Sequence, residues 1–394
     1  MIKSDFMDKL LDGVEVEWKS LGDVAELKRG RVMSKQYLIE NKGIYPVFSS
    51  QTANNGMIGS IDTFDFDGEY VNWTTDGANA GTVFYRTGKF SITNVSGLIK
   101  INNESRLNYK YLFYWLSIEA KKHVYSGMGN PKLMSNQVEK IPIPIPPLKV
   151  QEEIVRILEV FTELNAELTA ELTARKKQYE YYRDKLLTFD EGQVEWKTLG
   201  EIGQFVRGNG LQKNDFAESG VGCIHYGQIY TYYGNFAYHT KSFVSPTLAT
   251  KLRKAQKGDL IIATTSENIE DVCKPLVWLG EDEVCVSGET YVFKHSQNPK
   301  YLAYYLQTPM FFDYKKKNRT GTKVIRVHGD KLEKFEIAIP SLSEQARIVS
   351  ILDKFHALTS SITEGLPSEI ELRQKQYEYY RNMLLSFPKE EVVI

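Results

Sequence analysis

The stretch KKQYEYYRDKLLTF at residues 176–189 returns nearly unchanged as QKQYEYYRNMLLSF at residues 374–387. Two further segments repeat in the same order. VEWKSLGDVAELKRG, which begins at Val16, returns as VEWKTLGEIGQFVRG from Val194, and IPPLKVQEEIVRIL, which begins at Ile145, returns as IPSLSEQARIVSIL from Ile339. A repeat about half a chain long normally reflects two copies of one domain plan. The sequence therefore predicts two variable modules, each followed by a similar helix.

The repeated stretches belong to long predicted helices. After the proline-rich residues 141–147, apolar residues recur every seventh position from Ile154 and again from Leu158. Heptads sustained over this length favour a coiled coil, and we expect the two helices to pair antiparallel. The stretch EGLPSEIE at residues 364–371 should interrupt the second helix at Gly365 and Pro367 and restart it with a capping box formed by Ser368 and Glu371. Two unrelated amphipathic helices, each packed on its own module, are the alternative.

The variable modules are predicted to be α+β. Short β-branched and aromatic runs between Gly, Asn and Asp turns, such as EYVNWTT at residues 69–75, indicate strands, and residues 108–124 indicate a helix. The second module matches coarsely, with a strand at residues 258–265 and a helix at residues 299–307. We expect two α/β modules joined by two long antiparallel helices in a pseudo-twofold repeat, with boundaries at 1–147, 148–189, 190–340 and 341–389.

Composition and charge narrow the possible classes. The 394 residues carry a formal net charge of −1, so nucleic-acid binding would depend on local basic clusters rather than on overall charge. No apolar stretch approaches the ~20 residues of a membrane helix, and the first residues do not resemble a signal peptide. We therefore expect no membrane partner and a cytoplasmic location. The 3 cysteines and 6 histidines lack metal-ligand spacing, which predicts reduced thiols and no metal site.

Motifs of intrinsic catalysis are absent from the sequence. It contains no GxxxxGK[ST] phosphate loop and no GxSxG nucleophile elbow. The Asn-Pro pairs at Asn130 and Asn298 are followed by Lys, whereas a DNA-base methyltransferase would resemble its family in having Asn/Asp-Pro-Pro-aromatic. We therefore expect a chain that is not an enzyme, and a methyltransferase fused to its own recognition domain is disfavoured.

Basic and amide-rich segments are the stronger signals, and they point to DNA. Residues 315–326, KKKNRTGTKVIR, gather cations around a Thr-Gly pair, and such cations neutralise phosphates and release counterions. Amide and hydroxyl side chains in SSQTANNG at residues 49–56 and in similar loops suit hydrogen bonds to base edges. The predicted DNA-contacting residues are Lys28, Arg29, Arg31, Ser50, Gln51, Asn54, Asn55, Trp73, Thr74, Thr75, Asn79, Lys132, Arg207, Asn209, Lys213, Tyr226, Gln228, Thr264, Thr265, Ser266, Lys315, Lys316, Lys317, Arg319, Lys323 and Arg326.

Each of these signals has a structural alternative. A run of Lys and Arg is often the solvated end of a helix, and Asn-Gly and Asp-Gly are strong turn signals in their own right. Tyr-rich helices such as residues 109–115 are more often core than stacking platforms for bases.

The doubled VEWK[ST]LG, the exits IPIPIPPL and IAIPSLSEQARIVSILD, and the KQYEYYR helices resemble the specificity (S) subunit of type I restriction–modification systems over essentially the whole chain. The resemblance implies two target-recognition domains that each read one half of a split DNA site, held apart by the helices. One departure is Val150, which stands where the second helix has Glu344.

The resemblance also implies partners. They are double-stranded DNA, two modification (methyltransferase) subunits that use S-adenosylmethionine, and, for cleavage, restriction subunits that use ATP and Mg²⁺, with no cofactor on this chain. The residues expected to contact the partner subunits are Gln151, Gln345, Tyr179, Tyr182, Tyr377 and Tyr380.

The first helix would then act as a ruler. Residues 149–187 in one helix would extend about 55 Å at roughly 1.5 Å per residue. DNA advances ~34–36 Å per turn, so two modules at that spacing would face one side of the duplex. A coiled-coil scaffold whose modules bind proteins instead of DNA remains the alternative function, and the near-zero net charge favours it.

Overall fold

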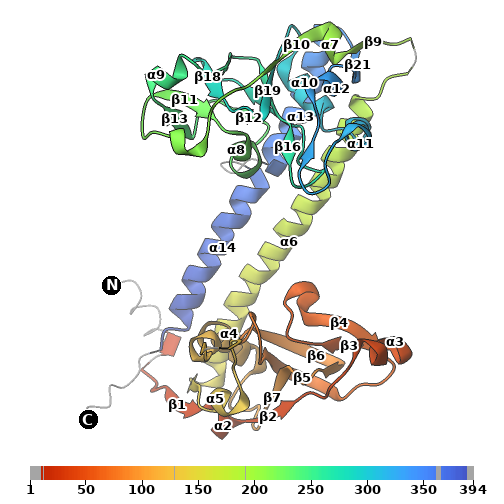
Figure 1. The fold of residues 1–394 in the computed structure, drawn as a ribbon. Helices are drawn as coiled ribbons and strands as arrows, with labels where there is room; N and C mark the ends of the chain where they lie inside the picture. The colour runs from red at the N-terminus through yellow and green to blue at the C-terminus, as the bar shows by residue number, and fades with distance from the viewer. Residues whose placement is uncertain (1–9, 12, 128, 191, 361–364, 388–394) are drawn as a thin grey trace. The chain divides into compact units, whose positions relative to one another are not determined.

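The computed structural model describes residues 10–11, 13–127, 129–190, 192–360 and 365–387. The chain forms two compact units (Figure 1): unit 1 comprises residues 1–167 and 371–394, and unit 2 comprises residues 168–370. Each unit therefore combines one variable module with a part of both long helices. Within the described ranges, no helix has the length and apolar character needed to cross a membrane.

Unit 1 is built on a six-stranded sheet with the strand order β2-β7-β5-β6-β3-β4. Most neighbouring strands are antiparallel, and β3 runs parallel to β6. The strand expected at residues 69–75 is confirmed as part of β5. The six strands are β2 (Ala25–Arg29), β3 (Lys42–Phe48), β4 (Met57–Ile61), β5 (Phe66–Thr74), β6 (Val83–Ile92) and β7 (Ser96–Ile101).

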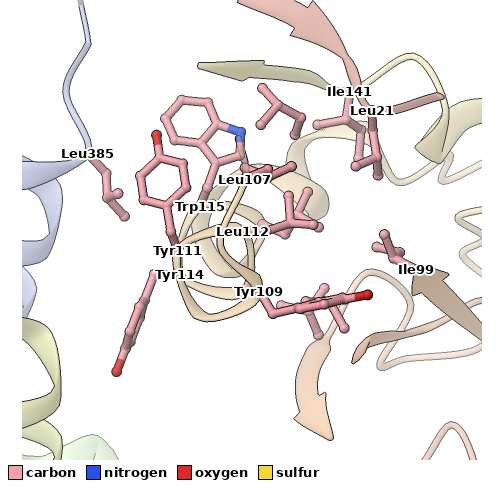
Figure 2. Close-up of a cluster of buried hydrophobic side chains, with 14 of the residues drawn as sticks. Leu21, Ile99, Leu107, Tyr109, Tyr111, Leu112, Tyr114, Trp115, Ile141 and Leu385 are labelled. Atoms are coloured by element: carbon pink, nitrogen blue, oxygen red, sulfur yellow. The ribbon is translucent and has the colours of Figure 1, made fainter. Parts of the chain in front are cut away.

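The helix expected at residues 108–124 is confirmed as α4 (Tyr109–Glu119) followed by a 3-10 turn. Asn108 caps α4 by accepting hydrogen bonds at Oδ1 from the backbone N–H of Lys110 and of Tyr111, which satisfies donors that a helix start leaves unpaired. The aromatic residues of α4 are core, as Figure 2 shows for Tyr111 and Trp115. Burying a large apolar side chain contributes about 1.5–3 kcal/mol, so this cluster anchors the unit.

Unit 2 contains two larger sheets, with the orders β10-β19-β15-β17-β12 and β13-β11-β18-β14. Residues 284–295 form two strands in different sheets because the chain turns between Val286 and Thr290. The expected strand at residues 258–265 and helix at residues 299–307 are confirmed as β15 and α10. The strands are β10 (Gly203–Arg207), β11 (Val221–Ile224), β12 (Phe236–Ala237), β13 (Ser242–Val244), β14 (Lys254–Ala255), β15 (Leu260–Ala263), β17 (Lys274–Trp278), β18 (Val284–Val286) and β19 (Thr290–His295), and the main helices are α8 (Tyr226–Thr231), α10 (Pro299–Tyr305) and α11 (Pro309–Asn318).

The repeated VEWK segments form a small ribbon in each unit. In unit 1, β1 (Glu17–Ser20) pairs antiparallel with β8 (Pro142–Ile145), and in unit 2, β9 (Glu195–Thr198) pairs antiparallel with β21 (Glu336–Ile339). A short helix follows each VEWK strand, as α2 (Leu21–Val24) and α7 (Leu199–Ile202). The repeated VEWK segment therefore forms the same two-stranded ribbon in both units, at the junction between each module and its long helix.

The long helices are α6 (Leu148–Leu186), α13 (Leu342–Ser360) and α14 (Gly365–Leu384). In unit 1, Phe161 of α6 stacks on Tyr380 of α14 with ring centroids 5.2 Å apart. In unit 2, Tyr182 of α6 stacks on Phe355 of α13 at 5.5 Å. The two Phe occupy equivalent places in the repeat, as do the two Tyr, so the same contact forms reciprocally. The antiparallel pairing and the pseudo-twofold repeat are confirmed, and the alternative of two unrelated helices is wrong.

The end of each QYEYYR helix completes the core of a unit. Leu384, Leu385 and Phe387 join the cluster around α4, with the Phe387 ring 6.3 Å from Tyr111 and 6.2 Å from Trp115. Figure 2 shows Leu385 beside this cluster. In unit 2, Leu187 and Phe189 join the core cluster around α10. The motif occurs twice because the apolar residues at its end complete the hydrophobic core of each module.

The expected interruption of the second helix is present. The helix α13 ends at Ser360 and α14 begins at Gly365, while residues 361–364 lie outside the described residues. Gly365 adopts a left-handed backbone with φ +79°, and a Cβ there would lie 2.4 Å from the carbonyl oxygen of Ala357. Glycine is therefore required. The predicted restart at Ser368 is wrong, because α14 begins three residues earlier.

Candidate nucleic-acid interface

In unit 1, loops that follow several strands meet at one end of the six-stranded sheet. Arg29, the last residue of β2, donates from Nη2 to Thr75 Oγ1 at 3.2 Å and to the carbonyl of Asn94. Lys132 pairs in antiparallel register with Asp76, and the backbone N–H of Leu133 donates to the Thr75 carbonyl at 2.9 Å. We call the set Arg29, Thr75, Asp76, Asn94 and Lys132 polar edge 1.

Unit 2 repeats the backbone pairings of this frame and also has an arginine at the matching place. Arg207, the last residue of β10, donates from Nε to the carbonyl of Gly288 at 3.1 Å. Arg326 pairs in antiparallel register with Thr265, and the N–H of Val327 donates to the Thr264 carbonyl at 3.2 Å. We call the set Arg207, Thr264, Thr265, Gly288 and Arg326 polar edge 2. Residues that the sequence analysis took from distant segments are thus brought together in both units.

The two edges differ in the side chains that the common frame carries. In unit 1 the N–H of Thr75 donates to the carbonyl of Val95, and in unit 2 the N–H of Thr264 donates to the carbonyl of Glu289 at the matching place. The apolar side chain of Val95 in unit 1 therefore corresponds to the carboxylate of Glu289 in unit 2. The bridging cation is Lys132 on one edge and Arg326 on the other.

Glu289 organises polar edge 2, and the sequence analysis missed it. Its Oε2 accepts a hydrogen bond from Thr265 Oγ1 at 2.5 Å and lies 3.6 Å from Arg326 Nε, while its Oε1 lies 3.9 Å from Arg207 Nη2. The Arg207 and Arg326 side chains remain 64% and 52% exposed. One carboxylate thus orients two guanidinium groups that still face solvent, which is an arrangement suited to phosphates or guanine edges.

Other predicted cations are exposed, some with an acidic neighbour. Lys28 lies 3.5 Å from Glu26, and Arg31 forms an ion pair with Asp65 at 3.0 Å. These exposed pairs contribute little to stability, so their cations are available to a stronger anion. Five further predicted cations are exposed: Lys213, Lys316, Lys317, Arg319 and Lys323.

Several predicted amides and hydroxyls brace their own loops. Gln51 donates from Nε2 to the carbonyl of Met57 at 2.6 Å. Asn209 accepts from the N–H of Arg253 at 2.6 Å, and Gln228 donates to Ser242 Oγ at 2.7 Å. The same holds for Asn79, whose Nδ2 donates to the carbonyl of Ser50 at 3.2 Å, and for Ser266, whose Oγ accepts from the backbone N–H of Asn268. Tyr226 is held through its backbone, whose N–H donates to Ser287 Oγ at 2.9 Å.

Six residues predicted to contact DNA have buried side chains. Trp73 is 1% exposed and donates from Nε1 to the carbonyl of Leu133 at 3.0 Å. Lys315 turns inward and donates from Nζ to the carbonyls of Glu270 and Val272, at 2.7 and 2.8 Å, and burial lowers its pKa. The hydroxyls of Thr74, Thr75, Thr264 and Thr265 are likewise buried and bonded inside the protein.

Gln151 and Gln345, which were predicted to contact the partner subunits, also have fully buried side chains. Gln151 Oε1 accepts from the N–H of Asn108 at 2.9 Å, and its Nε2 donates to the carbonyls of Arg106 and Pro146, both at 2.8 Å. It therefore ties the start of α6 to the cap of α4.

Gln345 makes the equivalent hydrogen bonds in unit 2. Its Oε1 accepts from the N–H of Asn298, the cap of α10, at 3.0 Å, and its Nε2 donates to Gln297 Oε1 at 2.8 Å and to the carbonyl of Pro340 at 2.9 Å. These glutamines join each module to its helix.

The predicted partner-binding tyrosines differ in exposure, and Tyr182 is 37% exposed. Tyr179 and Tyr377 are half-buried against the cores of their units, and burial raises the pKa of Tyr179 to about 12 and also raises that of Tyr377. Tyr182 and Tyr380 make the stacked contacts described above. The tyrosines that point outward are Tyr181, 60% exposed, and Tyr379, 49% exposed. Helical spacing alone does not show which tyrosine of YEYY faces solvent.

Comparisons with known proteins show which family this chain resembles. The family model described as "Type I restriction modification DNA specificity domain" matches residues 13–175 and 192–372. The chain is 36% identical, over all of both chains, to the Escherichia coli type I restriction enzyme EcoR124I/EcoR124II specificity subunit. It is 34% identical to a putative type I restriction enzyme specificity subunit of Haemophilus influenzae, covering 97% of this chain and 98% of that one.

Solved structures show the same fold. The S subunit of the type I restriction-modification system from M. genitalium aligns over 96% of this chain and 98% of its own, with a TM-score of 0.59 at 17% identity. A chain from a structure of complex assembly in the type I R-M system aligns over 94% and 98%, with a TM-score of 0.60 at 14% identity. Two DNA specificity domains joined by paired helices define the class of protein. The chain belongs to the family of type I restriction-modification specificity subunits.

Proposed function

We propose that each unit of this chain reads one half of a split DNA site through its polar edge. Recognition of DNA sequence is the role of this family. The observation that carries the proposal is the pair of edges, which share backbone hydrogen bonds, an arginine and a threonine but differ in their other side chains. A shared frame gives both units the same approach to a duplex, and different side chains give each unit its own sequence preference.

The repeated helices support docking of two copies of one partner. Lys177, Glu180 and Tyr181 of α6 are exposed, and so are the identical Lys375, Glu378 and Tyr379 of α14. The fold uses the inward faces of these helices, so the outward faces are available to two methyltransferase subunits, and restriction subunits would join for cleavage. In this assembly the present chain is not the catalyst, and S-adenosylmethionine, ATP and Mg²⁺ belong to the partners. The support is the sequence, which lacks the phosphate loop and the base-methylation motif.

DNA binding by the chain with its methyltransferase subunits, measured over a range of salt concentrations, tests the proposal. Neutralised phosphates give log K a slope of about −0.9 per phosphate against log salt. Replacing Lys316 and Lys317 with Gln should make the slope less steep by up to about 2. Lys257→Gln, at the opposite end of β15 from polar edge 2, should leave it unchanged. A protein-binding scaffold would show no such slope with any variant.

A further inference from the structure

Arg86 in β6 is a buried cation whose placement the fold alone does not explain. Its side chain is 3% exposed, and its guanidinium lies over the rings of Phe48 and Phe84, with Cζ 3.7 and 4.4 Å from the centroids. In the described part of the chain, Arg86 forms no ion pair with a carboxylate. Burial lowers its pKa to about 10. Because an unpaired buried charge is costly, we looked for what this guanidinium holds.

Arg86 holds the loop at residues 49–56 from beneath. Its Nη2 donates to the carbonyl of Asn55 at 2.8 Å, and its Nε lies 3.4 Å from Asn72 Oδ1. A Cβ at Gly56 would lie 3.0 Å from the same Nη2, so the loop and the guanidinium are in close contact. Any larger residue at position 56 would push against the guanidinium.

The loop that Arg86 holds has an unusual backbone. Asn54 and Asn55 both adopt left-handed conformations, with φ of 50° and 51°. Asn is one of the few residues that tolerate this region. Both side chains are exposed, and within the described ranges neither side-chain amide forms a hydrogen bond. Two neighbouring amides are thus presented outward on a loop that is fixed from inside.

The same loop is tied to polar edge 1. Thr93 Oγ1 donates to Ser49 Oγ at 2.8 Å, and Asn79 Nδ2 donates to the carbonyl of Ser50 at 3.2 Å. Thr93 and Asn79 lie in the turns beside Asn94 and Asp76 of that edge. The amides of Asn54 and Asn55 therefore keep a set position relative to Arg29 and Lys132.

We propose that Arg86 is a positioning residue for DNA reading by unit 1, and that Asn54 and Asn55 are the amides it positions. An Asn side chain can donate to N7 and accept from the N6 amino group of adenine in the major groove. The ligand group is therefore an adenine in the first half of the split site. This inference rests on the proposed function, and it adds a buried residue that touches no DNA.

The test uses the chain assembled with its methyltransferase subunits, with methylated sites mapped across a host genome and binding measured on duplexes altered in one half-site. Arg86→Gln should lower discrimination at one adenine position of the first half by roughly 5- to 150-fold, the range that a bidentate base contact provides. The second half and the salt slope should not change. Lys89→Gln on the same strand, which removes an exposed positive charge, is the matched control and should behave as the unaltered chain.

Three further variants change the loop at residues 49–56 instead of Arg86. Gly56→Ala adds the Cβ that meets Nη2 and should reproduce the Arg86→Gln effect without removing a buried group. Asn54→Gly and Asn55→Gly keep the left-handed backbone accessible while deleting an amide, and at least one of them should relax the same position. These variants decide the proposal even where Arg86→Gln fails to fold.

Other outcomes would overturn the inference. Unchanged first-half discrimination in Gly56→Ala and in both Asn variants would show that the loop does not read bases. A melting temperature lowered by Arg86→Gln, with discrimination intact, would make Arg86 structural only. A salt slope reduced by about 1 would mean that Arg86 itself contacts a phosphate. If the unaltered complex methylates no split site, the proposed function fails instead, which is a distinguishable result.

Discussion

The buried side chains of Gln151 and Gln345 give the most specific prediction about stability. Gln151→Met replaces a fully buried amide that makes three hydrogen bonds, to Asn108, Arg106 and Pro146, with an apolar side chain of similar length. One donor and two acceptors then lose their partner in a place that water does not reach. Unsatisfied buried groups cost about 1–3 kcal/mol each, and relaxation recovers part of this. We therefore expect a loss of about 3 kcal/mol in the free energy of unfolding.

Urea denaturation measures the total loss, and hydrogen exchange read by peptide shows where it falls. Faster exchange should appear around α4 and the start of α6, and unit 2 should be unaffected. Gln345→Met should give the mirror result around α10. Gln36→Met is the matched control, because Gln36 is exposed and bonds only to Glu40 within its helix, and it should change stability by less than about 0.5 kcal/mol.

A particular result would refute this reasoning. If Gln151→Met unfolds at the same urea concentration as Gln36→Met but binds its methyltransferase subunits more weakly, then Gln151 serves the partner and not the fold. The hydrogen bonds described above would then not be the reason that this residue occurs in both repeats.

Three further predictions follow from other parts of the chain. Glu289→Ala frees Arg207 and Arg326, so discrimination in the second half-site should fall while the salt slope of binding steepens by up to about 2; an unchanged slope would contradict this. Burial lowers the pKa of His295 to about 4, so between pH 6.5 and 4 the unfolded chain binds a proton that the folded chain excludes. Stability present at pH 7 should fall by about 2–3 kcal/mol by pH 4.5, and His295→Phe should remove most of that loss in urea titrations at the two pH values. Four residues inserted into the middle of α6 add one turn of about 6 Å, which should widen the spacer of the methylated site; a spacer of fixed length would contradict the ruler.

The helices and the domain organisation could be predicted because they depend on local sequence patterns that occur twice in the chain. Apolar heptads, the IP exits and the VEWK strands each specify one element, and the repeat shows that each element is built in both copies. The helix pairing followed from the same logic, and Phe161 with Tyr380 and Phe355 with Tyr182 bear it out.

Side-chain direction was harder to predict, because it depends on tertiary packing. Lys315 and Lys316 are neighbours in one basic run, yet one is buried and the other exposed, since α11 turns a single face to the core. Gln151 was assigned a partner contact from the family resemblance, whereas its burial depends on tertiary hydrogen bonds to Asn108 and Arg106. Glu289 gave no signal, because its role exists only where strands from three segments meet.

The central claim is that two different readers share one frame and act on separate halves of one site. The most direct measurement is a genome-wide map of methylated bases in a host that carries this chain with its methyltransferase subunits. The map is repeated after residues 190–340 are exchanged for the second module of a relative. The account predicts a split motif in which one half changes and the other half stays as it was. A continuous motif, or a change in both halves after the exchange, would contradict it.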